Sequence, residues 1–121
     1  MGETSILLVD DNLNLTRTLS FILKRQGFFV NTAQNGLEAV KKVKEKIYKI
    51  IFMDIKMPLM NGVEAFKKIK KINPNTFVMM MTAYAVEDLV QEAIEEGAKG
   101  IIYKPFDMDN FISIVRELAE T

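Results

Sequence analysis

Five short runs of hydrophobic residues occur along the chain, and within each run the apolar residues follow one another without alternating with polar ones. Continuous runs of this kind are typical of strands that are covered on both faces, as in a parallel sheet. We therefore expect strands at Ile6–Val9, Phe28–Val30, Ile50–Met53, Phe77–Met81 and Ile101–Tyr103.

The segments between these runs place apolar residues three and four positions apart, which is the spacing of one face of an α-helix. A helix with a single apolar face must bury that face, so each segment is expected to pack against the sheet. The apolar stripes are Leu15, Leu19, Ile22 and Leu23; Leu37, Val40 and Val43; Phe66 and Ile69; Leu89, Val90, Ala93 and Ile94; and Phe111, Ile112, Val115 and Leu118.

Glycine, asparagine and proline mark where these helices begin and end. Gly27 and Gly97 fall just past the first and fourth helices, Asn73-Pro74 stops the third, and Asn35-Gly36 marks the turn into the second. Alternating strands and helices with short, right-handed crossovers predict an α/β fold, a doubly wound five-stranded parallel sheet with five helices. We expect one domain that spans residues 1–121.

Composition narrows the class of protein. The chain has 121 residues, of which 49% are hydrophobic, so we expect a packed core. The formal net charge is zero and no block of Lys and Arg is interleaved with aromatic residues, so we expect no direct contact with nucleic acid. Nowhere do about 18 consecutive apolar residues occur, so we expect no contact with a membrane. It contains neither Cys nor His, which removes disulfides, thiolate sites and a phosphohistidine of its own. Residues 1–5 do not resemble a signal peptide, so we expect a soluble cytoplasmic protein.

Polar residues follow four of the expected strands. Asp10 and Asp11 follow the first strand, Asp54 the third, Thr82 the fourth, and Lys104, with Pro105, the fifth. In open parallel sheets, ligands bind outside the carboxyl ends of the strands. We therefore expect these side chains to converge in one crevice.

Three carboxylates in one crevice repel one another unless a cation neutralises them. Ligation by oxygen alone suits Mg²⁺, with Mn²⁺ as the alternative, and Mg²⁺ commonly uses one or two carboxylates and several waters. The competing interpretation of Asp10 and Asp11 is a helix N-cap ahead of Asn12, because Asp and Asn are good caps.

A carboxylate beside a metal can also act as a nucleophile and form an aspartyl phosphate. The Thr82 hydroxyl and the Lys104 ammonium could then stabilise the oxygens of the transferring phosphoryl group. Two other interpretations stay open on these residues: a metal-dependent phosphohydrolase that uses Asp54 or Asp10 as nucleophile, and a flavodoxin-type nucleotide carrier. The carrier would want a nest of Gly, Ser and Thr where this chain has carboxylates.

Four motifs resemble the receiver domain of bacterial two-component response regulators, over essentially the whole chain. They are LLVDDN at 7–12, MDIKMPLMNG at 53–62, MTAY at 81–84 and KGIIYKPF at 99–106. The resemblance implies a flavodoxin-like strand order 2-1-3-4-5. It also implies a signalling switch rather than an enzyme, which accepts phosphoryl in a Mg²⁺-dependent reaction from the phosphohistidine of a histidine kinase or a histidine phosphotransfer protein.

The resemblance also implies a role for each site residue. Asp54 is the phosphoacceptor and a metal ligand, Asp11 is a direct ligand, and Asp10 acts through a metal-bound water. The backbone carbonyl of Lys56 is the third protein ligand. Thr82 supplies the switch hydroxyl, and Lys104 pairs with the phosphoryl group and precedes an expected cis bond to Pro105. Pro58 and Gly62 match the loop after the acceptor.

In the family, the fourth helix, fifth strand and fifth helix form the output surface, which would meet a downstream protein. Residues 40–71 hold ten lysines against three acids, whereas residues 86–121 hold nine acids against three basic residues. We expect the acidic fourth helix to meet a basic partner, or a second receiver through Lys99 or Arg116. Whether the chain is a stand-alone receiver or part of a longer regulator stays open.

One position departs from the family's pattern. The aromatic residue that reports phosphorylation in many receivers lies three positions before the lysine, and Ile101 stands there. We do not take Tyr103 as its equivalent, because adjacent strand residues point to opposite faces. The resemblance therefore does not predict how this chain would transmit phosphorylation.

Overall fold

The computed structural model of the chain describes residues 4–83 and 86–121, so Met1–Glu3 and Tyr84 of the MTAY motif lie outside the described residues. Strands and helices alternate along the chain: β1 Ser5–Val9, α1 Leu13–Arg25, β2 Phe29–Ala33, α2 Gly36–Glu45, β3 Ile50–Asp54, α3 Gly62–Ile72, β4 Phe77–Thr82, α4 Glu87–Glu95, β5 Gly100–Tyr103 and α5 Met108–Glu120.

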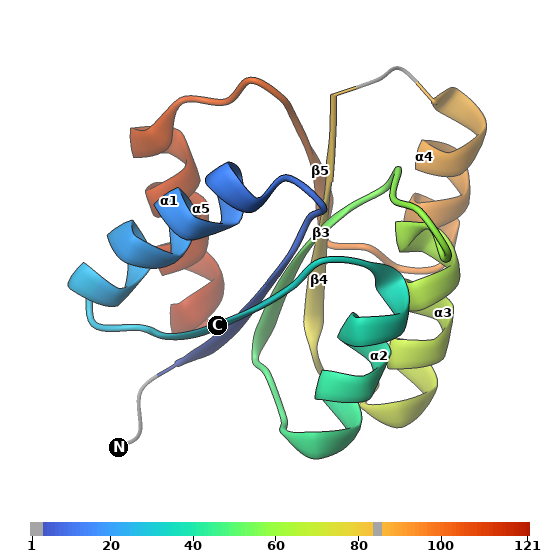
Figure 1. Cartoon of the computed structure of the whole chain (residues 1–121), viewed down its shortest axis with the longest axis horizontal. Helices are drawn as coiled ribbons and strands as arrows, with labels where there is room; N and C mark the ends of the chain where they lie inside the picture. Colours follow the sequence, from blue (N-terminus) through green and yellow to red (C-terminus); the bar gives the residue numbers. More distant parts are fainter. Residues whose placement is uncertain (1–3, 84–85) are drawn as a thin grey trace.

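The five strands form one parallel sheet in the order β2-β1-β3-β4-β5. Figure 1 shows α1 and α5 on one face of this sheet and α2, α3 and α4 on the other. The predicted α/β class and strand order are therefore confirmed. None of the helices in the described part of the chain combines the length and the hydrophobicity needed to cross a membrane.

The core consists of two apolar layers, one on each face of the sheet. One layer lies under α2, α3 and α4, and the other lies under α1 and α5. Ile6–Val9 of β1 and Ile50–Met53 of β3 are fully buried. Burying one such side chain contributes about 1.5–3 kcal/mol, so the centre of the sheet is its most strongly stabilised part. The residues at the ends of β1 and β3 are therefore attached to strands that are firmly packed in the core.

Polar side chains cap the starts of four helices, and two of the glycines expected past helix ends adopt a left-handed conformation. Asn12, Asn35, Asn61 and Asp107 each accept a backbone N–H at the start of a helix. Gly27 and Gly97 adopt φ of 95° and 102° just past α1 and α4, a conformation that favours glycine. The start of α4, at Val86, has no side-chain cap.

Strand β2 differs from the sequence prediction. We expected it at Phe28–Val30, but it runs from Phe29 to Ala33 and includes the polar residues Asn31 and Thr32. β2 is an edge strand, so polar side chains can lie along it partly exposed. The Asn31 side-chain amide donates a hydrogen bond of 2.8 Å to the hydroxyl of the buried Tyr48. This hydrogen bond satisfies a polar group that a hydrophobic pattern does not anticipate.

Leu59, in the loop between β3 and α3, has a left-handed backbone conformation that a substitution can test. Its φ is +72°, and its side chain is 79% exposed. A left-handed conformation costs an L-residue about 1–2 kcal/mol. Glycine does not have this cost, but it loses roughly 0.5–1 kcal/mol more conformational entropy on folding. We expect Leu59→Gly to raise the free energy of unfolding, measured in urea, by about 0.5–1 kcal/mol relative to Leu59→Ala. Lower stability of the glycine variant would contradict this conformation.

Candidate functional site

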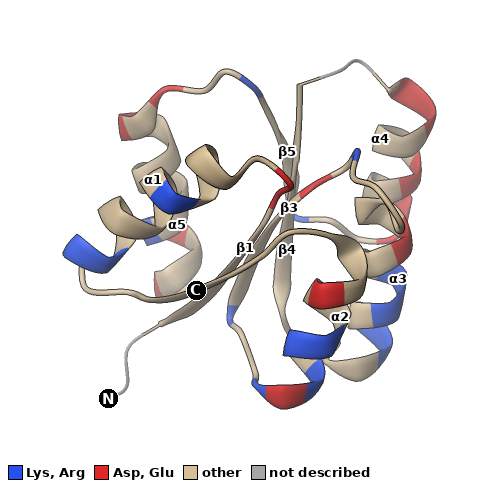
Figure 2. Cartoon of the chain, in the orientation of Figure 1, with Lys and Arg blue, Asp and Glu red and all other residues tan. Residues whose placement is uncertain are grey.

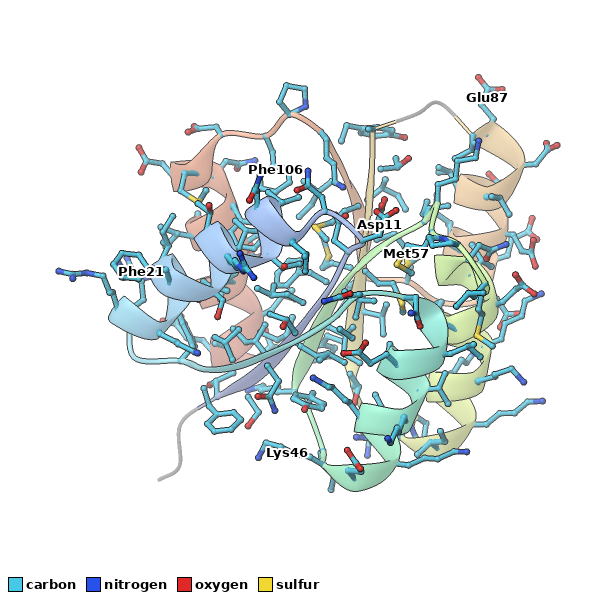
Figure 3. The ribbon with its side chains drawn as sticks, viewed as in Figure 1. Asp11, Phe21, Lys46, Met57, Glu87 and Phe106 are labelled. Carbon is cyan, nitrogen blue, oxygen red and sulfur yellow. The ribbon has the colours of Figure 1, made fainter. Side chains whose placement is uncertain are left out.

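The carboxyl ends of the strands bring the polar residues singled out above to one edge of the sheet. Asp10 comes directly after β1, Asp54 and Thr82 are the last residues of β3 and β4, and Lys104 follows β5. Figure 3 shows Asp11 and Met57 at this edge, between the two helical layers. The parallel direction of the strands is the reason that residues up to 94 positions apart meet here.

Three carboxylates crowd together at this edge. Asp10, Asp11 and Asp54 each offer an oxygen, and these oxygens all lie within 4.8 Å of one another. Asp10 and Asp54 are only 1% and 7% exposed, whereas Asp11 is exposed. Within the described residues this is the only group of three or more acids that could hold a metal ion. The donor set is all oxygen, which suits Mg²⁺.

Lys104 partly neutralises this charge. Its ammonium forms an ion pair and hydrogen bond with Oδ2 of Asp10, and its Nζ lies 3.6 Å from Oδ2 of Asp54. The backbone N–H of Lys104 donates to the carbonyl of Thr82 over 2.8 Å, which ties the ends of β4 and β5 together. The lysine is therefore held beside both buried carboxylates.

The side chain of Asn12, rather than that of Asp10 or Asp11, is the N-cap of α1. The side chain of Asn12 caps α1 by accepting from the N–H of Leu15 at 3.2 Å. Asp10 accepts from the N–H of Asn12 at 2.9 Å, so one of its oxygens stabilises the turn while the other contacts Lys104. Because Asn12 provides the cap, Asp10 and Asp11 are available to the crevice.

A cavity of about 510 Å³ opens onto these residues. It is lined by Asp10, Asp11, Asn12, Asp54, Lys56, Met57, Pro58, Ala83 and Lys104. Thr82 was expected in the same crevice, but its side chain is fully buried, and its neighbour Ala83 lines the cavity instead. The structure thus brings the carboxylates, Lys56 and Lys104 together around the cavity, whereas Thr82 is fully buried at the end of β4.

Close packing fixes the loop that follows Asp54. A Cβ on Gly62 would lie 2.3 Å from the carbonyl oxygen of Asp54, and a Cβ on Gly36 would lie 2.8 Å from that of Met60. Only glycine fits such approaches, so the starts of α2 and α3 can press against the loop. The role of Gly36 was not visible in the sequence, because it depends on a contact between segments that are far apart along the chain.

Burial is the main reason that the pKa of the Asp54 carboxyl is higher than usual, which makes it a weaker acid. Burial, together with the neighbouring Asp10 carboxylate, raises the pKa of Asp54 from 3.8 to about 6, although the charge of Lys104 opposes the shift. Asp11 raises the pKa further, and a hydrogen bond from the backbone N–H of Lys56 lowers it. A carboxyl group with this pKa is still mostly ionised near neutral pH, as a nucleophile must be.

Tyr103 and Ile101 are expected on the same face of β5, so the argument from opposite faces against Tyr103 is wrong. Tyr103 lies two residues from Ile101, and side chains two apart on a strand point to the same face. Ile101 packs in the layer under α2, α3 and α4, and Ile102 packs in the opposite layer. Tyr103 is 58% exposed. An aromatic ring is therefore present on the Ile101 side of β5, although not at the position of the family's aromatic.

Known proteins resemble this chain over almost its whole length. The model of the response regulator receiver domain matches residues 6–116. The chain is 39% identical over 121 residues to the chemotaxis protein CheY of Thermotoga maritima, covering 99% of this chain and 100% of that protein. It is 38% identical over 120 residues to the transcriptional regulatory protein ZraR of Klebsiella oxytoca, covering 98% of this chain but only 27% of that protein.

A solved structure agrees with these relatives. The crystal structure of the response regulator protein TrrA from Thermotoga maritima, in complex with Mg²⁺ and beryllofluoride, superposes with a TM-score of 0.84 at 30% identity. The match covers 95% of this chain and 98% of that one. The comparisons give no support to the phosphohydrolase interpretation.

The raised pKa of Asp54 predicts a pH-dependent stability in metal-free protein. Below pH 3.8 the carboxyl is protonated whether folded or unfolded, and as pH rises through about 6 its ionisation increasingly favours the unfolded chain. We expect Asp54→Asn to raise the free energy of unfolding by about 1–3 kcal/mol at about pH 8, and the gain to vanish near about pH 4.

Urea unfolding with a chelator present measures this difference. The matched control is Asp88→Asn, which removes an exposed carboxylate on α4 and should change stability by less than about 0.5 kcal/mol at either pH. If Asp54→Asn lowered the free energy of unfolding at about pH 8, the ionised Asp54 carboxylate would not be destabilised by its surroundings, and the raised pKa would be wrong.

Proposed function

The chain belongs to the response regulator receiver domain family, which works in two-component phosphorelay signalling, and on that premise we propose that Asp54 is its phosphoacceptor. The observation that carries this proposal is the crowding of Asp10, Asp11 and Asp54 within 4.8 Å beside Lys104. Asp10 and Asp54 are both buried, line the cavity and contact the lysine, but Oδ1 of Asp10 accepts from the N–H of Asn12 and its Oδ2 bonds Lys104. Both oxygens of Asp10 are thus engaged, which favours Asp54 as the acceptor.

We propose that Asp10, Asp11 and Asp54, with the backbone carbonyl of Lys56, hold Mg²⁺, or Mn²⁺ in its place. When bound, the ion would supply positive charge to the carboxylates and to the oxygens of a phosphoryl group. The all-oxygen donor set favours this choice, and the TrrA structure is a complex with Mg²⁺ and beryllofluoride.

In the proposed transfer, a carboxylate oxygen of Asp54 attacks phosphorus, and the bond from phosphorus to the donor's imidazole nitrogen breaks. Lys104 lies near enough to pair with the phosphoryl oxygens once they occupy Asp54. Thr82 would contribute its hydroxyl after a local rearrangement, because the residue is fully buried. Hydrolysis of the acyl phosphate would reset the switch, so the chain acts as a switch and not as an enzyme of metabolism.

The phosphoryl donor would be another molecule, because this chain has no His that could carry a phosphohistidine. We expect a histidine kinase or a histidine phosphotransfer protein. A cytoplasmic location stays a prediction, based on the absence of cysteine. The chain spans about a quarter of the ZraR regulator that it matches, so the output of any longer protein stays open.

We propose α4, β5 and α5 as the surface that meets a downstream protein. Figure 2 shows acidic residues along α4 and basic residues on the lower turns of α3. Glu92 forms an ion pair with Lys67 of α3, so part of the acidic charge is already used within the molecule. Lys99 lies over the Phe77 ring, and Arg116 bonds Gln26, which argues against either as the anchor of a second receiver.

Phosphorylation by acetyl phosphate tests the assignment of Asp54. With Mg²⁺ present, intact-mass measurement should show a single phosphoryl adduct that is stable to acid and labile to base. Asp54→Asn should reduce its formation by at least about a hundredfold because the nucleophile is lost. Omission of the metal should slow the adduct in the wild type as well.

The control for this experiment is Asp109→Asn, which removes an exposed carboxylate at the start of α5 and should form the adduct normally. An Asp54→Asn variant that acquired the adduct at the wild-type rate would rule out Asp54 as the acceptor. Steady release of phosphate from many small phosphoesters would instead favour a hydrolase.

A further inference from the structure

The charged residues are sorted between the helices of the structure. α1 carries three basic residues and no acid, and α3 carries four lysines against one acid. α4 carries four acids and no basic residue, and α5 carries three acids against one arginine. Figure 2 shows this division on the α2, α3 and α4 side as blue lower turns next to a red helix. Each face of the sheet therefore carries a basic helix and an acidic helix, although the net charge is zero.

Helices α3 and α4 are neighbours, and their facing sides already pair these charges. Lys67 forms an ion pair and hydrogen bond with Glu92. Lys70 lies 3.5 Å from Oε2 of Glu96 and donates to its backbone carbonyl over 2.6 Å. The lysine face of an α3 helix and the acidic face of an α4 helix are therefore complementary within one molecule.

The outward sides of the same two helices repeat this charge pattern without ion pairs among the described residues, although Glu95 accepts a hydrogen bond of 3.2 Å from the side-chain amide of Gln91. Lys68 and Lys71, one position beyond Lys67 and Lys70, are exposed and make no ion pair or hydrogen bond with the residues that the structure describes. We call them the lysine pair. On α4, the outward residues Glu87, Asp88 and Glu95 form an exposed acidic stripe. In Figure 3, Glu87 points away from the body of the molecule.

An exposed apolar residue accompanies each charged group. Ile72 follows the lysine pair at the end of α3, and Ile94 lies within the acidic stripe of α4. An apolar residue among charges can be covered when two surfaces meet, which adds to the electrostatic attraction. The two surfaces thus carry opposite charges, and each has one exposed apolar residue.

From this match we infer that a second copy of this chain docks its acidic stripe on α4 against the lysine pair on α3. This inference rests on the proposed output surface and names a basic surface that meets it, and it does not require phosphorylation of Asp54. Exposed ion pairs are individually weak, so the association should be weak and dependent on salt.

The geometry of this contact differs from that of a symmetric dimer. A two-fold dimer through α4 would bring two acidic stripes together, and like charges repel. A contact between the lysine pair of one copy and the acidic stripe of the next uses two different surfaces. Such a heterologous contact leaves one surface free at each end, so it forms a series of oligomers unless rotation closes a ring.

Sedimentation velocity of unphosphorylated protein at several concentrations tests the inference with two complementary variants. Lys68→Gln with Lys71→Gln removes the lysine pair, and Glu87→Gln with Asp88→Asn and Glu95→Gln removes the acidic stripe. Each variant alone should stay monomeric, because it lacks one of the two surfaces. A mixture of both should form a dimer with one copy of each variant and nothing larger.

Wild-type protein should form oligomers at about 0.01 M salt, where screening extends to about 30 Å, and association should weaken at least about tenfold at about 1 M salt. Arg17→Gln with Lys24→Gln is the matched control, because it removes two exposed basic residues from α1 on the other face of the sheet. The control should associate like the wild type.

Three results would overturn the inference: a wild type that stays monomeric throughout, a dimer that survives loss of the lysine pair, or equal weakening by the control. Adduct formation with acetyl phosphate, measured on the same variants, keeps the two proposals separate. Normal adduct formation without association would refute only the docking, whereas normal association without an adduct at Asp54 would refute only the proposed acceptor.

Discussion

Repulsion among three carboxylates at the carboxyl end of the sheet is the constraint to which the surrounding structure responds. Asp10 and Asp54 sit at the ends of β1 and β3, which pair directly in the fully buried centre of the sheet, so the two groups cannot move apart. Lys104 contacts both, and the pKa of Asp54 still rises because burial and the neighbouring acids outweigh the lysine. A site that keeps negative charge under this strain favours a divalent cation and positively charged partners.

The two sides of the site are held with unequal strength. The loop after Asp54 is fixed by Gly62 against the Asp54 carbonyl and by the cap that Asn61 and Glu64 form at the start of α3. Helix α4 follows β4 on the other side, lacks a side-chain cap, buries only Ala93 and relies on exposed ion pairs to α3. Segments with few buried contacts open at lower free energy, so α4 is the helix that a change at the site can displace at least cost.

The fold class and the meeting of the site residues could be predicted from the sequence, because hydrophobic runs locate the strands and parallel strands end at one edge. The features that could not be predicted depend on distances between segments that are far apart along the chain. The polar half of β2, the full burial of Thr82 and the ion pairs between α3 and α4 are of this kind. For Asp10 and Asp11, the sequence left a helix cap and a site as alternatives, and the contacts of Asn12 exclude the cap.

A crystal structure with Mg²⁺ and beryllofluoride tests the central claim, phosphoryl acceptance by Asp54 at a metal site, most directly. The account predicts the ion on carboxylate oxygens of Asp10, Asp11 and Asp54, and beryllofluoride on the Asp54 carboxylate within hydrogen-bond reach of Lys104. Beryllofluoride on another residue, or an Asp54 carboxylate that stays unmodified at saturating concentrations of both reagents, would contradict it.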